Sequence, residues 1–321
     1  MEIENKSILI WLAICAVLVY AMIVVGGYTR LTHSGLSIVE WKPISGTIPP
    51  LSMESWQEEF EQYKLSPEFK IINSTMDISS FKQIFWVEYI HRLLGRLTGL
   101  VFLLPFLYFY RRLSSSQVKY FSFIALLMGA QGAIGWFMVK SGLSSEPSVS
   151  QYRLALHLVV ACVILSLLVW KITPGRSTSS RYAYFSLFLL LLQITSGAFV
   201  AGLNAGLVYN SFPLMDGELI PKGLLIMKPS YLNLFENVTM VQFIHRFLGV
   251  INFINLLAYS YKIFNLETKK KNAIILSGLI TIQLLLGIFT LLLQTPLFLA
   301  LMHQAVAILL LITMVISLKG K

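Results

Sequence analysis

Residues 87–95 read VEYIHRLLG, and residues 241–249 read VQFIHRFLG. Both stretches share one frame, in which a valine, an acid or amide and an aromatic residue precede Ile-His-Arg and a final Leu-Gly. Each stretch opens a long apolar segment, and agreement over this length is not expected by chance even in apolar sequence. The chain is therefore predicted to contain an internal repeat with a histidine at the same place in each copy.

The composition around these stretches is that of a membrane protein. Of 321 residues, 56% are hydrophobic and only 12% are charged, whereas a soluble domain carries about 25% charged residues. An ordinary soluble enzyme and a disordered chain are therefore excluded. Both cysteines, Cys15 and Cys162, lie in apolar runs, which argues against a disulfide framework and a cysteine-ligated metal site.

Eight segments are long and apolar enough to cross a bilayer, whose hydrocarbon core needs about 20 residues of helix. The first starts too close to Met1 for a transit peptide and lacks a cleavage pattern, so we expect a retained helix. The long polar loop over 28–85 is expected to carry a surface helix with a capping box at Ser55 to Glu58. The segments are residues 8–27, 86–110, 120–139, 154–171, 182–202, 239–261, 273–293 and 297–318.

Basic residues indicate that both termini face the cytoplasm. With the N-terminus inside, the inner segments carry 13 Lys and Arg residues, and the much longer outer segments carry 9. This is the usual positive-inside bias. The net charge of +10 is thus a topology signal and does not indicate nucleic-acid binding.

The repeat predicts the architecture. Each half has four spans, and an even number gives both copies the same orientation in the membrane. We predict an all-α membrane protein whose eight transmembrane helices form two pseudo-twofold-related four-helix bundles, over residues 1–171 and 172–321. Three of the odd-numbered spans also carry Gln-x-x-x-Gly, at Gln131/Gly135, Gln193/Gly197 and Gln283/Gly287.

Four of the five histidines lie in the even-numbered spans, a few residues past the outer end of each. At 1.5 Å per residue, this places them roughly 6–13 Å deep. A single such histidine is often bonded to a neighbouring helix, but four at one depth, two per bundle, indicate function. Two imidazoles facing across a bundle can hold haem iron from both sides, whereas zinc would need further ligands. These histidines are His91, His157, His245 and His303.

Charged residues flank two of these histidines. Arg92 and Arg246 directly follow their histidines and could pair with haem propionates or anchor the helices at the interface. Glu88 precedes His91 by three residues, on the same helix face, whereas the second half has Gln242. An acid within a span is costly and usually functional, and a pair between Glu88 and Arg92 would not exclude catalysis. The asymmetry suggests a haem that is acted on in the first half and a haem that passes electrons in the second.

Together these features resemble the haem A synthase family, which has eight spans, a four-helix repeat and one histidine on each even span. The E-x-x-H-R run from Glu88 to Arg92 and the stretch over 26–37, GGYTRLTHSGLS, carry the resemblance. It implies oxidation of the C8 methyl group of haem O to a formyl group, by successive hydroxylations, giving haem A for cytochrome oxidase. It also implies that His91 and His157 flank haem O, that His245 and His303 hold haem b, and that Glu88 is the catalytic carboxylate.

The resemblance further implies the bacterial plasma (inner) membrane, with the haem sites toward the outer face. The partners would be membrane lipid, a haem O synthase as haem O donor, an electron donor that the sequence does not identify, and the cytochrome oxidase assembly machinery as haem A acceptor. Some members carry a cysteine pair in their outer loops. Because Cys15 and Cys162 lie within spans, a thiol mechanism is not expected. His33 has no clear counterpart in the second half, where Asn204 lies nearby, and we expect it to pack the loop or admit haem.

Two alternatives use the same features. A di-haem b membrane electron-transfer protein would use the same histidines without making a product, but both pairs would lie on one side of the membrane, and Glu88 breaks the symmetry. A transporter with parallel repeats predicts discontinuous helices near the midplane, whereas the polar residues here lie toward the outer face.

Overall fold

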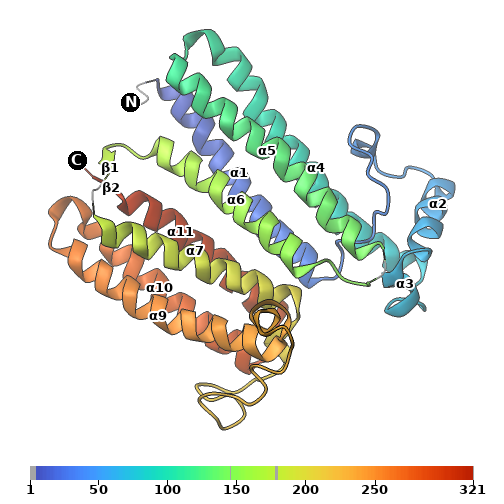
Figure 1. Ribbon diagram of the computed structural model, residues 1–321. Coiled ribbons are helices and arrows are strands. Elements are labelled where there is room, and N and C mark those ends of the chain that lie inside the picture. The colour runs from blue at the N-terminus through green and yellow to red at the C-terminus, as the bar shows by residue number, and fades with distance from the viewer. Residues whose placement is uncertain (1–4, 145, 178–179, 321) are drawn as a thin grey trace. The chain divides into compact units, whose positions relative to one another are not determined.

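The structure is a computed structural model that describes residues 5–144, 146–177 and 180–320. Eight of its helices are long and apolar enough to cross a membrane (Figure 1), which confirms the all-α membrane class and the eight predicted spans. The predicted halves, 1–171 and 172–321, also include positions 1–4, 145, 178–179 and 321, which lie outside the described residues. The eight helices are α1 (Lys6–Leu31), α4 (Ile78–Phe109), α5 (Ser115–Gly142), α6 (Gln151–Ile172), α7 (Arg181–Gly202), α9 (Val238–Phe264), α10 (Lys270–Leu292) and α11 (Leu297–Ser317).

The remaining elements are short. The segment after α1 carries α2 (Met53–Lys64) and α3 (Pro67–Ile71), and the segment after α7 carries α8 (Asn233–Glu236). Strands β1 (Arg176–Ser177) and β2 (Lys319–Gly320) form one antiparallel pair. The 3-10 turns are η1 (Ser45–Thr47), η2 (Tyr110–Arg112), η3 (Ala205–Leu207), η4 (Ser230–Leu232) and η5 (Glu267–Lys269).

Helix α4 begins at Ile78, well before the predicted start at residue 86. Asp77 caps it, because its side chain accepts a hydrogen bond from the backbone N–H of Ser80 at 2.8 Å. The added turns bury Phe81 and Phe85 against α2, so an aromatic core extends the helix beyond its apolar stretch. Apolar length alone does not detect such an extension.

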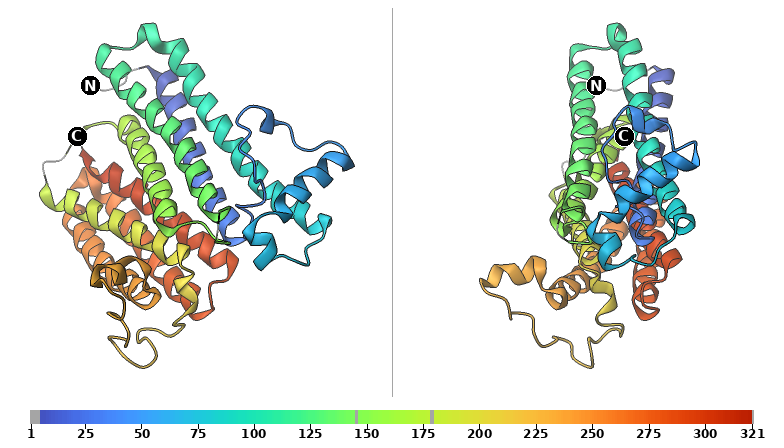
Figure 2. Two further views of the ribbon diagram at one scale, coloured as in Figure 1. Left: turned by 45° about the vertical axis from the view of Figure 1, so that its right-hand side comes forward. Right: turned by 90° about the vertical axis from the view of Figure 1, so that its right-hand side faces the viewer.

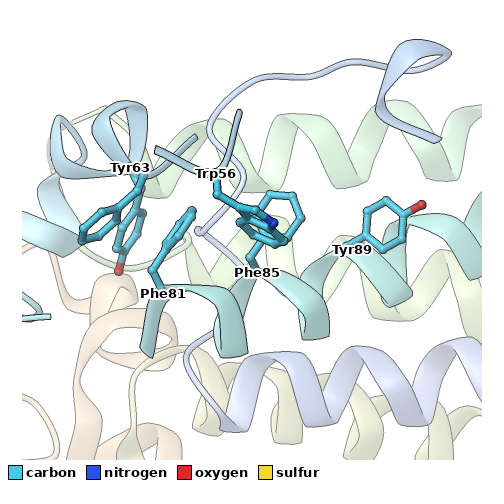
Figure 3. Packing of buried hydrophobic residues seen from close by; sticks show 6 residues of the cluster. Trp56, Tyr63, Phe81, Phe85 and Tyr89 are labelled. Carbon is cyan, nitrogen blue, oxygen red and sulfur yellow. The ribbon is translucent and has the colours of Figure 1, made fainter. Parts of the chain in front are cut away.

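An aromatic cluster fixes the segment between α1 and α4 on α4 (Figure 3). Trp56 and Tyr63 of α2 pack against Phe85 and Phe81 of α4, with ring centroids 4.9 and 5.3 Å apart. The predicted capping box at Ser55 to Glu58 was wrong. Ser52 is the N-cap, and Ser52 and Ser55 exchange reciprocal bonds, because Ser52 is the residue with extended backbone just before the helix.

The chain divides into two compact units, one comprising the described parts of Met1–Ala16 and Leu158–Lys321 and the other Val17–His157. In the first of these, α7, α9, α10 and α11 form a closed ring in which each helix contacts two neighbours, in that order. Figures 1 and 2 show these four helices, yellow to red, running side by side. The predicted twofold relation between two bundles stays a prediction.

Candidate functional site

The second-half pair, His245 on α9 and His303 on α11, points into the ring of helices. The two imidazole centroids lie 6.5 Å apart, with an interplanar angle of 80°. Two metal–nitrogen bonds of about 2 Å each and two imidazole radii of ~1 Å give a centroid separation of about 6 Å. The spacing would leave room for one metal ion between the two rings, so His245 and His303 are the residues that would hold the iron of a haem in this half.

The first-half pair is His91 on α4 and His157 on α6. Nδ1 of His91, His157 and His303 is buried and has no hydrogen-bond partner among the described residues. Buried polar atoms normally have a partner, so these imidazoles are suited to bind a further group that interacts with their ring nitrogens.

The surroundings of the histidines also suit haem better than zinc. Among the described residues, no three His, Cys, Asp or Glu side chains gather in a way that could hold a metal ion. A zinc site needs three or four such ligands, whereas haem iron already has four ring nitrogens and needs only axial ones. The histidine pairs therefore fit haem.

Each of the four imidazoles lies over a glycine of the preceding span. A Cβ placed on any of these glycines would lie 2.9–3.2 Å from Cε1 of its histidine, so the ring fills the space of the missing side chain. Sequence analysis noted three of the glycines in Gln-x-x-x-Gly but assigned them no role. The pairs are Gly26 with His91, Gly135 with His157, Gly197 with His245 and Gly287 with His303.

Glu88 is 2% exposed and fully hydrogen-bonded. Its Oε1 accepts from Nη2 and Nε of Arg92, at 2.7 and 3.0 Å. Its Oε2 accepts from Oγ of Ser37 at 2.7 Å and from the backbone N–H of Ile38 at 2.8 Å. The pair with Arg92, one of the two predicted roles, is therefore present, and the carboxylate is tied to the loop between α1 and α4.

Both predicted arginines donate to the loop that precedes their own helix. Arg92 donates to the backbone carbonyls of Ile38 and Glu40, at 2.8 and 3.1 Å. Arg246 donates to the backbone carbonyls of Tyr209 and Ser211. The two halves thus use an arginine at the same place to hold the loop before the helix, and pairing with haem propionates stays a prediction.

A second buried acid, which the sequence does not reveal, lies outside the spans. Glu68 on α3 is 3% exposed, and its Oε2 accepts a hydrogen bond from the Tyr63 hydroxyl at 3.1 Å. Asn73 donates to the same hydroxyl oxygen at 2.7 Å. Burial raises the pKa of Glu68 to about 7, and the charge of Glu88 acts in the same direction. No sequence signal distinguishes Glu68 from the other acids of this loop, which are exposed or paired at the surface.

His33 does have a counterpart in the second half. Both His33 and Asn204 adopt a left-handed backbone, with φ of 51°, and each lies seven residues after the glycine that contacts a histidine. Asparagine and histidine are among the residues that tolerate this conformation best. His33 therefore turns the chain at the end of α1. Its expected role in packing the loop or admitting haem stays a prediction.

Comparison with known proteins agrees with this geometry. The profile of the cytochrome oxidase assembly protein family, COX15-CtaA, matches residues 9–315. A Heme A synthase of Wolbachia pipientis wMel is 46% identical over 314 residues, covering 94% of this chain and 89% of the relative. One from Nitrosospira multiformis is 47% identical over 332 residues, covering 95% and 91%. One from Maricaulis maris is 47% identical over 324 residues, covering 97% and 95%. Because these matches span nearly the whole sequence, the chain belongs to the COX15-CtaA family of cytochrome oxidase assembly proteins.

Proposed function

We propose that this protein is a membrane oxidoreductase that makes haem A, by oxidising the C8 methyl group of haem O to a formyl group. The observation that carries the proposal is the presence of two histidine pairs, each ring lying over a glycine, with a buried acid beside only one pair. Relatives named Heme A synthase, at about 45% identity over nearly the full length, support the same reaction.

The two halves would bind different haems. His91 and His157 would hold the substrate, haem O, and His245 and His303 would hold haem b. Haem b, when bound, supplies one-electron transfer. The support for this assignment is the asymmetry between Glu88 and Gln242, since only the first half has a buried acid beside its histidines.

Glu88 would act at the substrate. It lies one turn from His91 on α4, and four donors keep its carboxylate in one orientation. A fixed negative charge stabilises positive charge that develops on a nearby substrate carbon. The 2.7 Å bond to Ser37 also offers a path for a proton toward the outer loop.

The proposed function also implies a cellular location and a set of partners. The protein would lie in the bacterial plasma membrane with both termini in the cytoplasm and the haem sites toward the outer face. It would receive haem O from a haem O synthase and would need a separate electron donor. Because the change from methyl to formyl removes four electrons from the carbon, it would also need dioxygen as the oxidant. It would pass haem A to the machinery that assembles cytochrome oxidase.

Haem extraction tests this proposal. The protein is purified after expression beside a haem O source, and its extracted haems are resolved by chromatography. We expect haem b together with haem O, hydroxylated derivatives or haem A. Haem b alone, with the haem O source shown to be active, would identify an electron-transfer protein and overturn the proposal.

A further inference from the structure

We propose that Gln-x-x-x-Gly forms a socket that fixes three of the four histidines. Met22 takes the place of the glutamine in the fourth socket, so His91 is the ligand from which haem is released most easily. We use the term histidine socket for a glycine that contacts the imidazole together with the residue four positions before it. The inference rests on the proposed function, since it takes the four histidines as haem ligands.

The glycine of each socket sets the position of the ring. The closest distances from a hypothetical Cβ to Cε1 are 3.1 Å at Gly26, 3.0 Å at Gly135, 3.2 Å at Gly197 and 2.9 Å at Gly287. At such distances a methyl group would require the imidazole to move by a few tenths of an ångström or more. The ring therefore lies directly on the helix backbone, and the contact is the same in all four sockets.

The glutamine adds a polar restraint. Gln131 Nε2 donates to the backbone carbonyl of His157 at 2.9 Å, and Gln193 Nε2 donates to that of His245 at 3.1 Å. Nε2 of Gln283 lies 3.4 Å from Nε2 of the His303 ring. A residue four positions before the glycine lies on the same helix face, so both parts of the socket reach one histidine.

The first socket lacks this restraint. Met22 occupies the position of the glutamine on α1, four residues before Gly26. Its Cε lies 3.4 Å from where a Cβ of Gly95 would be, and Nε2 of Gln193 lies 3.5 Å from the equivalent point at Gly249. Since Gly95 and Gly249 end the two repeated stretches, Met22 and Gln193 are equivalent.

The chemistry of these two side chains differs. A thioether has no hydrogen to donate, and methionine is the more flexible side chain. His91 is therefore positioned by Gly26 without a hydrogen bond from Met22. An enzyme must release its product but retain its resident cofactor, and the unrestrained histidine lies in the half to which we assign the substrate.

Exchanging the two residues tests the proposal. Met22→Gln and Gln193→Met variants are purified with their haem, and haem loss to excess apomyoglobin is followed by absorbance. Gln193→Met should release haem b about fivefold faster, as expected for one lost hydrogen bond. Met22→Gln should slow the release of haem O or haem A by a similar factor. Wild-type release rates in both variants would overturn the proposal.

Two alanine variants of α10 test the glycine part with a matched control. Gly287→Ala should lower haem b content and alter its low-spin spectrum, because the added methyl group meets His303. Gly278→Ala should leave both unchanged, since no described atom outside the neighbouring backbone of its own helix lies within 4 Å of the Cβ position there. An unaltered spectrum in a folded Gly287→Ala protein would refute the role of the glycine. A wild-type protein without a bis-histidine haem spectrum would instead refute the proposed function.

Discussion

Glu88 and Gln242 hold the same place in the repeat, yet their hydrogen bonds to the preceding loop run in opposite directions. Glu88 accepts from the backbone N–H of Ile38 at 2.8 Å, whereas Gln242 donates to the backbone carbonyl of Tyr209 at 3.0 Å. The loop backbone therefore presents a donor in the first half and an acceptor in the second. Each of the described polar neighbours of Glu88 donates a hydrogen bond to it, so the first half stabilises a carboxylate at this position.

Replacing this carboxylate should stop the chemistry and leave the second site intact. In Glu88→Gln the amide oxygen can still accept from Ile38, but the ion pair with Arg92 is lost. We expect haem O to accumulate while haem b absorbance persists, as measured by haem extraction and difference spectra. Normal haem A output from this variant would remove Glu88 from the mechanism.

The reverse exchange is the matched control. In Gln242→Glu the carboxylate would face the carbonyl oxygen of Tyr209 with no proton to donate. We expect a loss of ~1–3 kcal/mol in stability, the cost of leaving a buried polar group without its partner. A thermal unfolding midpoint equal to that of the wild-type protein would show that the Tyr209 contact does not contribute.

Arg246→Lys separates the loop contacts of Arg246 from its predicted pairing with haem propionates. A lysine ammonium cannot span two carbonyls as the guanidinium fork does, so Arg246→Lys should loosen the loop around Tyr209 and Ser211. Faster proteolysis of this loop, relative to an Arg112→Lys control at an exposed position, would show the structural role. A shift in the haem b midpoint potential in addition would support propionate pairing, and no change in either would refute both roles.

Glu68 should make the stability of the segment that carries α2 and α3 depend on pH. Because its pKa is raised to about 7 when folded, the folded protein keeps a proton that the unfolded chain has lost at the same pH. The stabilisation is complete below the ordinary carboxyl pKa and is lost as pH rises through about 7. After correction for intrinsic exchange, the amide hydrogens of α2 and α3 should therefore exchange faster at pH 8 than at pH 5.

Glu68→Gln tests the origin of that slope. Glutamine is neutral at every pH and can still accept from Tyr63, so the exchange rate should change less between the two pH values after correction for intrinsic exchange. Glu58→Gln, at an exposed position of α2, should keep the wild-type slope. A slope that survives Glu68→Gln would assign the pH dependence to another group.

The spans and the histidine pairs could be predicted because long apolar runs and repeated motifs are properties of the sequence itself. The start of α4 and the cap at Ser52 could not, since they depend on tertiary packing and on which residue is extended. The burial of Glu68 depends on tertiary packing against the aromatic cluster that contains Tyr63. The Gln-x-x-x-Gly motif was visible, but its relation to the histidines needed side-chain positions.

Removing one ligand of the second pair tests the assignment of haem b. In His245→Ala the imidazole of His303 would face no partner across the 6.5 Å between their ring centroids, and an iron held from one side loses its low-spin character. We expect loss of the haem b absorbance bands in reduced-minus-oxidised spectra. His33→Asn is the matched control, because asparagine already occupies the equivalent left-handed position at Asn204. If His245→Ala retained the wild-type spectrum, the haem b would have to be held elsewhere, since no other histidine of the second half could replace this ligand.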